Sequence, residues 1–317
     1  MSTPRKPIAI LMLGGGRSVS MAELLKESGR RRGAEVEVTG YELITKVPLA
    51  SVGNIVQGMQ WDDERVVDDI VRVARELDVD IILPFSNVAV DVAARVRPLL
   101  PDVFMPVCDP ETAAVMFDKI EAAKAFKDSG LPMPRTYNVL SAELPAIAKP
   151  RHGRCSRGVK VFTNMEDLMH LEHIQDYLIQ AYIANKDEYT VDCYVTQQGE
   201  ILCAVPRLRK HVSDGESTRT VTCRQPELER MVRKVIETFR LRGPVNVQFL
   251  YDRDRDRYLL MEVNPRLSSG VICSIKAGAP IADYIIGESL GDKLEPCDDW
   301  RDNTLMTRYW KEVIFYN

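Results

Sequence analysis

The chain has 317 residues, of which 45% are hydrophobic and 28% are charged, the composition of an ordinary soluble enzyme. This length is sufficient for a large core that divides into two or three lobes. The formal net charge of −4 gives no basis for binding nucleic acid or an anionic membrane. No apolar run approaches the ~20 residues that span a bilayer, and residues 8–13 are too few for a signal-peptide core.

Seven cysteines are scattered along the chain, and no two of them form a Cys-x-x-Cys pair. This spacing argues against a zinc site or a disulfide framework and favours a reducing compartment. We therefore expect a cytoplasmic protein with no nucleic-acid or membrane partner.

Strand and helix patterns alternate over the first third of the chain. We predict strands at residues 8–13, 36–39, 80–84 and 103–106, and helices that end near residue 32 or span 62–77 and 88–100. This alternation predicts a parallel sheet with crossover helices, a Rossmann-like domain over residues 1–107. Ligands bind such sheets at the carboxyl ends of the strands, where the loops 14–18 and 85–87 lie.

The triplet Gly14-Gly15-Gly16 only partly matches a dinucleotide-binding loop, because Val19 stands where the third glycine belongs. Its amides at a helix start favour a carboxylate or phosphate, so we expect it to bind an acidic substrate or face a nucleotide. A tight turn is the alternative. A nicotinamide-dependent enzyme is the weaker interpretation, because Glu37 lies inside the predicted strand and Glu42 follows it.

The most informative segment is the predicted strand that leads into Glu262, Asn264 and Arg266. Alternate residues of a strand share one face, so these three side chains lie together. A carboxylate, an amide oxygen and a guanidinium suit a hard cation bound to phosphate. A polar sheet edge ended by Pro265 is the alternative.

The strand at 245–251 and the charged turn at 252–257 predict a hairpin with that segment. A turn centred on Arg255 places Gln248 opposite Glu262, so a second oxygen donor would neighbour the carboxylate.

Further motifs precede this hairpin, between residues 118 and 158. Asp118-Lys119 precedes a helix at 120–128 and the sequence Gly-Leu-Pro-Met-Pro at 130–134. Lys149 ends a strand and opens a basic, glycine-containing loop at 151–158. Two lysines that enter one cleft would neutralise phosphates, whereas two solvated lysines are the alternative.

Taken in order, these motifs and the segments 178–183 and 188–192 resemble the ATP-grasp superfamily. They are most similar to the ATP-binding halves of carbamoyl-phosphate synthase large subunits, over about residues 108–292. The resemblance implies an α/β protein. Its N-terminal parallel-sheet (pre-ATP-grasp, Rossmann-like) domain at 1–107 precedes a two-lobed α+β ATP-grasp domain at 108–292. The lid lobe of that domain would span about 118–182, and a tail at 293–317 would pack on the core.

The resemblance also implies roles for individual residues. The residues expected to contact ATP are Lys119, Lys149, Ser156, Gly158, Gln180, Ala181, Tyr182, Ile183 and Glu188. The expected metal ligands are Gln248, Glu262 and Asn264. Catalytic contacts are expected from Arg266, Lys149 and Arg207, the last in a basic run taken to follow a strand at 201–205. The metal would be Mg²⁺, with Mn²⁺ as an alternative. The chain departs from the family at Ala181, usually Glu, and at Asn185, often Gly.

The implied activity is that of an ATP-dependent carboxylate–amine or carboxylate–thiol ligase that forms ADP through an acyl phosphate. Its partners would be a small carboxylate and an amine, with a homodimer as the default assembly. Three alternatives remain open: a kinase or carbamoyl-phosphate-synthase-like half, a non-catalytic regulatory protein that binds ATP, and a nicotinamide-dependent oxidoreductase.

Overall fold

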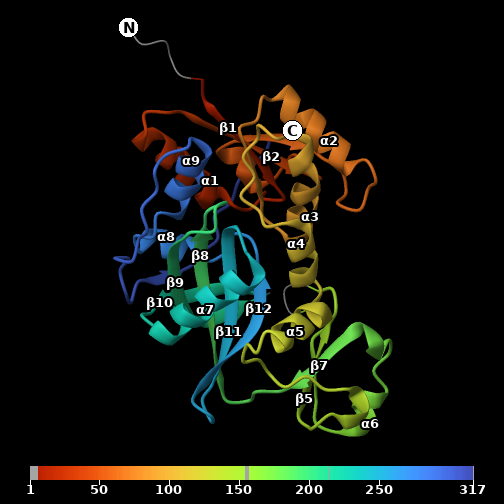
Figure 1. Cartoon of the computed structure of the whole chain (residues 1–317). Coiled ribbons are helices and arrows are strands. Elements are labelled where there is room, and N and C mark those ends of the chain that lie inside the picture. The colour runs from red at the N-terminus through yellow and green to blue at the C-terminus, as the bar shows by residue number, and fades with distance from the viewer. Residues whose placement is uncertain (1–5, 154–156, 214, 317) are drawn as a thin grey trace.

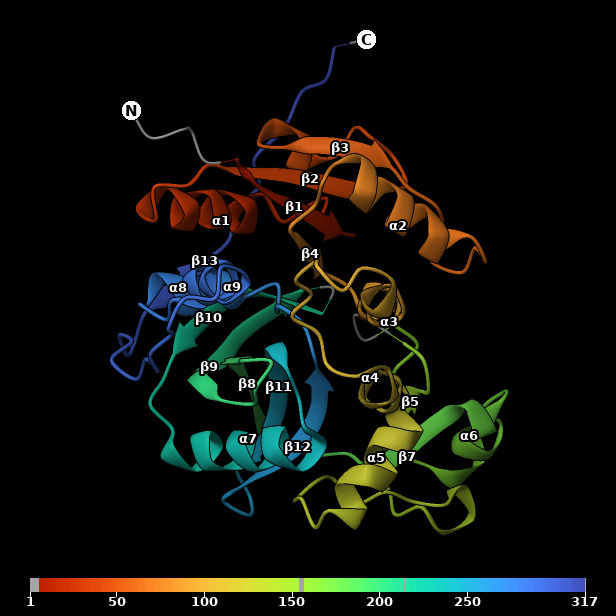
Figure 2. The same ribbon diagram turned by 45° about the horizontal axis from the view of Figure 1, so that its top comes forward.

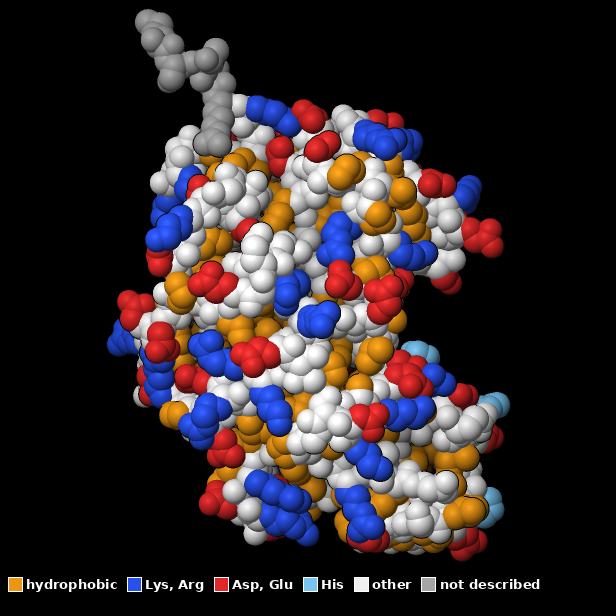
Figure 3. All heavy atoms as spheres, viewed as in Figure 1, with side chains coloured by type: hydrophobic (Ala, Val, Ile, Leu, Met, Phe, Trp, Pro, Cys, Tyr) orange, Lys and Arg blue, Asp and Glu red, His pale blue; other side chains and the backbone are white. Residues whose placement is uncertain are grey.

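The computed structural model describes residues 6–153, 157–213 and 215–316. In Figure 1 an N-terminal α/β unit lies above a large antiparallel sheet, and a small lobe projects to one side. On the face in Figure 3 the outline is indented between the N-terminal unit and the small lobe, and basic and acidic side chains are interspersed. Among the described residues no helix combines the length and apolar character needed to cross a membrane.

The N-terminal unit is built on a parallel sheet with the strand order β3-β2-β1-β4. Its elements are β1 (Ile8–Leu13), α1 (Val19–Arg31), β2 (Val36–Glu42), β3 (Asn54–Gln57), α2 (Val66–Glu76), β4 (Ile81–Pro84) and α3 (Asn87–Val96). The predicted parallel sheet is confirmed. The predicted strand at 103–106 is wrong, because Phe104 makes only an isolated bridge to Ile81, and β3 was missed.

Successive side chains of β1 enter two different apolar cores, as strand alternation requires. Ile10 and Met12 pack with α1 and α9 (Ile281–Ser289), whereas Leu11 and Leu13 pack with α2 and α3. Because both faces are covered, the strand is almost continuously apolar.

The large sheet has the order β12-β11-β8-β9-β10-β13, with antiparallel pairing throughout. Its strands are β8 (Lys186–Val195), β9 (Ile201–Ser213), β10 (Glu216–Thr222), β11 (Gly243–Asp252), β12 (Arg257–Asn264) and β13 (Leu305–Thr307). Helix α7 (Pro226–Phe239) packs Val232 and Val235 against Val247 and Phe249 on one face. Toward the N-terminal unit lie α8 (Val271–Lys276) and α9, which share an apolar core with it (Figure 2).

The small lobe contains the antiparallel sheet β6-β5-β7. Its elements are β5 (Ala146–Pro150), β6 (Lys160–Phe162), α6 (Met165–Met169) and β7 (Tyr177–Ala181), and α4 (Pro110–Phe117) and α5 (Lys119–Asp128) lead into it. Short 3₁₀ helices occur at Pro48–Ser51, Arg97–Leu99, Val139–Ser141 and Ile174–Asp176. A core around Ala148, Phe162 and Ile179 holds the lobe together.

The segment after α9 returns to the large sheet. Trp300 is only 2% exposed, and β13 pairs with β10 in the register Arg219↔Thr307. Beyond this strand Trp310 is 89% exposed, and the chain end projects past the N-terminal sheet in Figure 2. The domain boundaries at 107 and 292 stay predictions.

Candidate active site

The face of the large sheet opposite α7 is polar. Side chains of β8, β11 and β12 alternate between the two faces around this point, so that Val191, Val247 and Val263 face the α7 core. The side chains between them face the other way, and they are Thr190, Asp192, Asn246, Gln248, Glu262 and Asn264. A sheet face of this kind is buried at little cost only when its polar groups find partners.

The predicted pairing of Gln248 with Glu262 is confirmed, and Asn246 pairs with Asn264. The predicted turn centre at Arg255 is off, because Asp252 pairs with Arg257 and a register shift between Gln248 and Phe249 makes up the difference. Glu262 is half-buried, yet its carboxylate makes no hydrogen bond or ion pair with any residue that the structure describes. The Oδ1 atom of Asn264 accepts from Nη2 of Arg266 at 3.2 Å.

The described part of the chain contains no group of three or more His, Cys, Asp or Glu side chains suited to a metal. Gln248, Glu262 and Asn264 offer instead one carboxylate and two amide oxygens. This donor set fits Mg²⁺, which accepts few protein ligands and completes its shell with phosphate oxygens and water. The unpaired carboxylate of Glu262 supports this fit, because a half-buried anion is stabilised by a cation.

Lys149 lies at the end of β5, across from this hairpin. Its Nζ atom donates to Oε1 of Gln180 at 3.0 Å. Burial lowers the pKa of Lys149 to about 8, and the positive charge of Lys119 acts in the same direction. The negative charges of Glu262 and Glu188 act in the opposite direction and raise it. These interactions bring the predicted phosphate-binding lysines and the predicted metal ligand into one region between the small lobe and the large sheet.

The start of α5 holds Lys119 near the loop that follows β5. Asp118 caps the helix by accepting from the amides of Ile120 at 3.0 Å and Glu121 at 3.2 Å. Burial alone would raise the pKa of Asp118, but Arg151, whose Nε lies 2.6 Å away, and the two amides lower it overall. The Lys119 ammonium donates to the carbonyl of Gly153 at 2.8 Å.

Two of the predicted phosphate contacts lie in that loop. Ser156 falls outside the described residues. Gly158 has a positive φ of 73°, and a Cβ there would lie 2.9 Å from Cγ of Pro150, so a side chain would be strained. The close approach brings the end of the loop back over the end of β5.

The predicted adenine edge follows β7. The amide of Ala181 donates to the carbonyl of Arg135 at 2.8 Å, and that of Tyr182 donates to Pro145 at 3.1 Å. The Ile183 carbonyl accepts from Lys186 at 3.0 Å. The Ile183 amide has no acceptor among the described residues and is therefore a donor that remains for a ligand.

Glu188, the predicted ribose contact, lies on β8 at the edge of the polar face. Its Oε2 accepts from Nη1 of Arg209 at 3.1 Å, and the same nitrogen lies 3.4 Å from Oε1 of Gln248. Arg209 therefore links a predicted nucleotide contact to a predicted metal ligand. The sequence did not predict this link, because the partners of Arg209 are up to 39 residues away.

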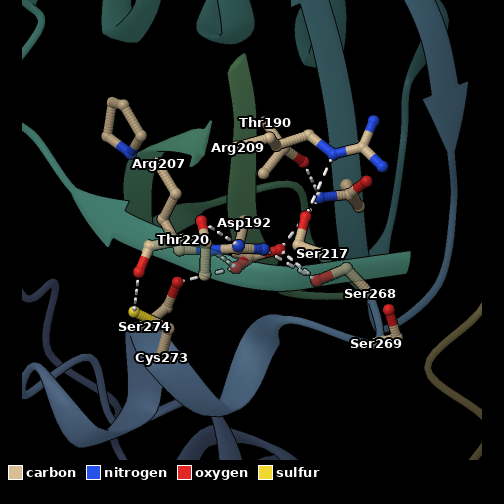
Figure 4. A network of polar contacts seen from close by, with 12 residues as sticks. Thr190, Asp192, Arg207, Arg209, Ser217, Thr220, Ser268, Ser269, Cys273 and Ser274 are labelled. Atoms are coloured by element: carbon tan, nitrogen blue, oxygen red, sulfur yellow. Dashed lines mark hydrogen bonds and ion pairs between the residues drawn. The ribbon is translucent and has the colours of Figure 1, made fainter. Parts of the chain in front are cut away.

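Arg207 has a different setting from the expected one. It lies inside β9 rather than in a loop after the strand, because β9 continues to Ser213 and pairs with β10. Its side chain is 1% exposed, and its Nε donates to Asp192 at 2.8 Å. Figure 4 shows the guanidinium flanked by Thr220 and Ser268 as well. A catalytic contact of Arg207 stays a prediction that this burial does not favour.

Asp192 is the centre of that network. Hydroxyl groups of Ser268 and Ser274 donate to it at 2.7 and 2.6 Å, and Asn246 donates at 2.9 Å. Burial would raise the pKa of Asp192, but Arg207 and the hydroxyls outweigh burial and lower it. The network ties the loop after β12 to three strands of the sheet.

The amides of the glycine loop after β1 already bond a side chain of the protein, that of Glu42. The amides of Gly15 and Gly16 donate to the carboxylate of Glu42, whose pKa is raised by burial despite these bonds. Strand β2 extends to Glu42, three residues beyond its predicted end. The structure thus favours the tight-turn alternative, and a pyrophosphate at these amides would compete with Glu42.

Comparisons with known proteins agree with this fold. A family model described as ATP-grasp in the biosynthetic pathway with Ter operon matches residues 173–309. The C-terminal section of the carbamoyl phosphate synthase large chain of Methanopyrus kandleri is 22% identical, over 78% of this chain and 48% of that protein. These matches support the resemblance of the chain to the ATP-grasp superfamily. The chain thus spans about half the length of this relative.

Solved structures show the ATP-grasp fold over nearly the whole chain. The biotin carboxylase domain of a Hydrogenobacter thermophilus 2-oxoglutarate carboxylase, in complex with MgADP, ADP and bicarbonate, has a TM-score of 0.75 at 15% identity and covers 95% of this chain and 74% of that one. An N5-carboxyaminoimidazole synthetase from Staphylococcus aureus complexed with ADP has a TM-score of 0.74 at 18% identity, covering 93% and 80%. The predicted fold class and resemblance are therefore confirmed.

Proposed function

We propose that the protein is an ATP-dependent carboxylate–amine ligase that releases ADP and passes through an acyl phosphate. The observation that carries the proposal is the setting of Glu262. Its half-buried carboxylate has no partner among the described residues, faces Gln248 across the hairpin, and lies near the Lys149 ammonium. An anion kept in such a place is suited to hold a cation that is itself bound to phosphate.

The residues around Glu262 would have separate roles in phosphoryl transfer. Gln248, Glu262 and Asn264 would hold Mg²⁺, which would supply positive charge to the phosphates. Lys149 and Lys119 would offset charge on the phosphates from the lid side. Arg266 would face the transferring group, because its guanidinium neighbours Asn264.

The nucleotide base would lie along the segment after β7. The Ile183 amide would donate to a ring nitrogen, because the neighbouring amides already have partners in the protein. Glu188 would accept from ribose hydroxyls beside Arg209. Gly158 and Ser156 would contribute backbone and hydroxyl donors to the phosphates from the lid loop.

The names of the similar proteins support this assignment. The protein from Methanopyrus kandleri is a carbamoyl phosphate synthase section, and the structural neighbours bind ADP, MgADP or bicarbonate. We infer from them a small carboxylate as the acceptor of the phosphoryl group and an amine as the nucleophile. Mn²⁺ in place of Mg²⁺, a homodimer and a cytoplasmic location stay predictions.

The test is ADP release from Mg-ATP in the presence of pools of small carboxylates and amines, with Glu262→Gln assayed beside the wild type. Release stimulated by one pool and lost in Glu262→Gln is expected. Glu200→Gln, an exposed change in the β8–β9 turn, is the matched control and keeps full activity. Hydroxylamine should trap the acyl phosphate as a hydroxamate; release without hydroxamate would indicate a kinase instead.

A further inference from the structure

The N-terminal unit contacts a residue of the candidate active site through the side chain of Asn87. This residue begins α3 at the carboxyl end of β4, in one of the two loops where parallel sheets bind ligands. Its Oδ1 atom accepts from Nε of Arg266 at 2.6 Å. No role for Asn87 follows from the ATP-grasp motifs, all of which lie after residue 107.

Two further acceptors hold the guanidinium of Arg266. Nη1 donates to the carbonyl of Leu267 at 3.1 Å, and Nη2 donates to Oδ1 of Asn264 at 3.2 Å. Both acceptors lie within two residues of Arg266, so they move together with its own loop. Asn87 is 179 residues away, at the start of α3 in the N-terminal unit, so this bond ties the guanidinium to that unit.

The loop that carries Asn87 is itself firmly placed. The Ser86 hydroxyl caps α3 by accepting from the amide of Ala89 at 3.2 Å. Ala89 and Val90 are fully buried against the N-terminal sheet, and Leu83 just before the loop is buried within β4. A rigid helix start of this kind can orient a side chain more closely than a mobile surface loop.

We propose that Asn87 is a positioning residue that fixes the plane of the Arg266 guanidinium beside Asn264. The catalytic consequence rests on the proposed function: Arg266 then faces the transferring phosphoryl group without first having to rotate. A neutral amide suits this role, because it accepts the Nε–H without placing an opposing charge beside the guanidinium. A carboxylate in its place would hold the guanidinium but offset part of its charge.

Three variants separate positioning from folding. Asn87→Leu has a similar size and removes the acceptor, whereas Asn87→Asp restores an acceptor oxygen with added charge. Val88→Ala, a change at an exposed neighbouring position, leaves both the cap of α3 and the bond to Arg266, so it is the matched control. In Asn87→Leu we expect kcat for ADP release to fall about 10–100-fold, with KM for Mg-ATP unchanged. Asn87→Asp should recover only part of kcat.

A second measurement does not depend on turnover. The Nε–H of Arg266, identified in ¹⁵N spectra by its loss in Arg266→Lys, should exchange slowly with water in the wild type. It should exchange faster in Asn87→Leu and slowly again in Asn87→Asp and Val88→Ala. Exchange that is equally slow in Asn87→Leu would overturn the proposal, as would a kcat equal to that of Val88→Ala.

The two proposals fail in different ways. A wild type that releases no ADP with any pool counts against the ligase, while the exchange rates still decide whether Asn87 holds Arg266. If the wild type releases ADP and Asn87→Leu is equally active, the ligase proposal stands and the positioning role of Asn87 is refuted.

Discussion

The pKa of Lys149 makes nucleotide affinity depend on pH in a way that an ordinary lysine would not produce. Burial lowers this pKa to about 8 in the ligand-free protein. The charged fraction of such a group falls from about 0.9 at pH 7 to about 0.1 at pH 9. If the charged form binds the phosphates, the affinity for MgADP weakens about tenfold over this range. Binding near pH 8 should then be accompanied by proton uptake.

The assay is a titration of the protein with MgADP at pH 7, 8 and 9, together with Lys149→Arg and Lys119→Arg. A guanidinium stays charged throughout, so Lys149→Arg should bind with an affinity that does not change with pH. Lys119→Arg is the control and should keep the wild-type dependence. Equal affinity of the wild type at pH 7 and pH 9 would refute the reasoning, and so would a Lys149→Arg curve as steep as the wild-type curve.

The same pKa has a consequence for stability, and its sign is opposite to that of a lysine in a favourable ion pair. The unfolded chain holds the Lys149 proton up to its usual pKa of 10.5, whereas the folded chain releases it near 8. The unfolded state therefore binds more protons between these values, and this residue makes the protein more stable as pH rises through that window. Lys149→Met should remove this rise in urea unfolding curves.

Two further predictions concern the core of the large sheet and the tail. Asp192→Ala leaves Arg207 buried and unpaired, so it should lower the free energy of unfolding by about 3–5 kcal/mol in urea melts. Asp187→Ala, which breaks an exposed pair on the same strand, should cost about 0–1 kcal/mol; equal losses would contradict the buried network. The low pKa of Asp192 adds stability above pH ~4 that is lost as pH falls through its folded value. Trp300→Ala should cost about 3–5 kcal/mol, and an unchanged thermal midpoint would show that the tail does not pack on the core.

Local patterns in the sequence were sufficient for the elements that place the site. The hairpin is a short-range structure, so its charged turn and flanking strands predict the pairing of Gln248 with Glu262. The strand–helix alternation of the N-terminal unit likewise predicts parallel pairing. The short strand β3 escaped prediction because it is only four residues long and largely exposed.

Contacts between residues far apart in the chain could not be predicted from the sequence. The basic run that contains Arg207 resembles a solvated loop until Asp192 and the serines that follow β12 are known to surround it. The alternation of Arg207, Arg209 and His211 with other residues was a sign of a strand, because it repeats every second position. Glu42 meets the glycine loop only because β2 is longer than its apolar part.

The central claim is that Glu262 holds the metal for phosphoryl transfer to a carboxylate. The most direct test is hydroxamate formation from Mg-ATP, hydroxylamine and carboxylate pools, comparing the wild type with Glu262→Gln at matched folding stability. The account predicts hydroxamate and ADP in equal amounts with one pool in the wild type, and neither product above background in Glu262→Gln. Wild-type amounts of both products from Glu262→Gln would contradict it.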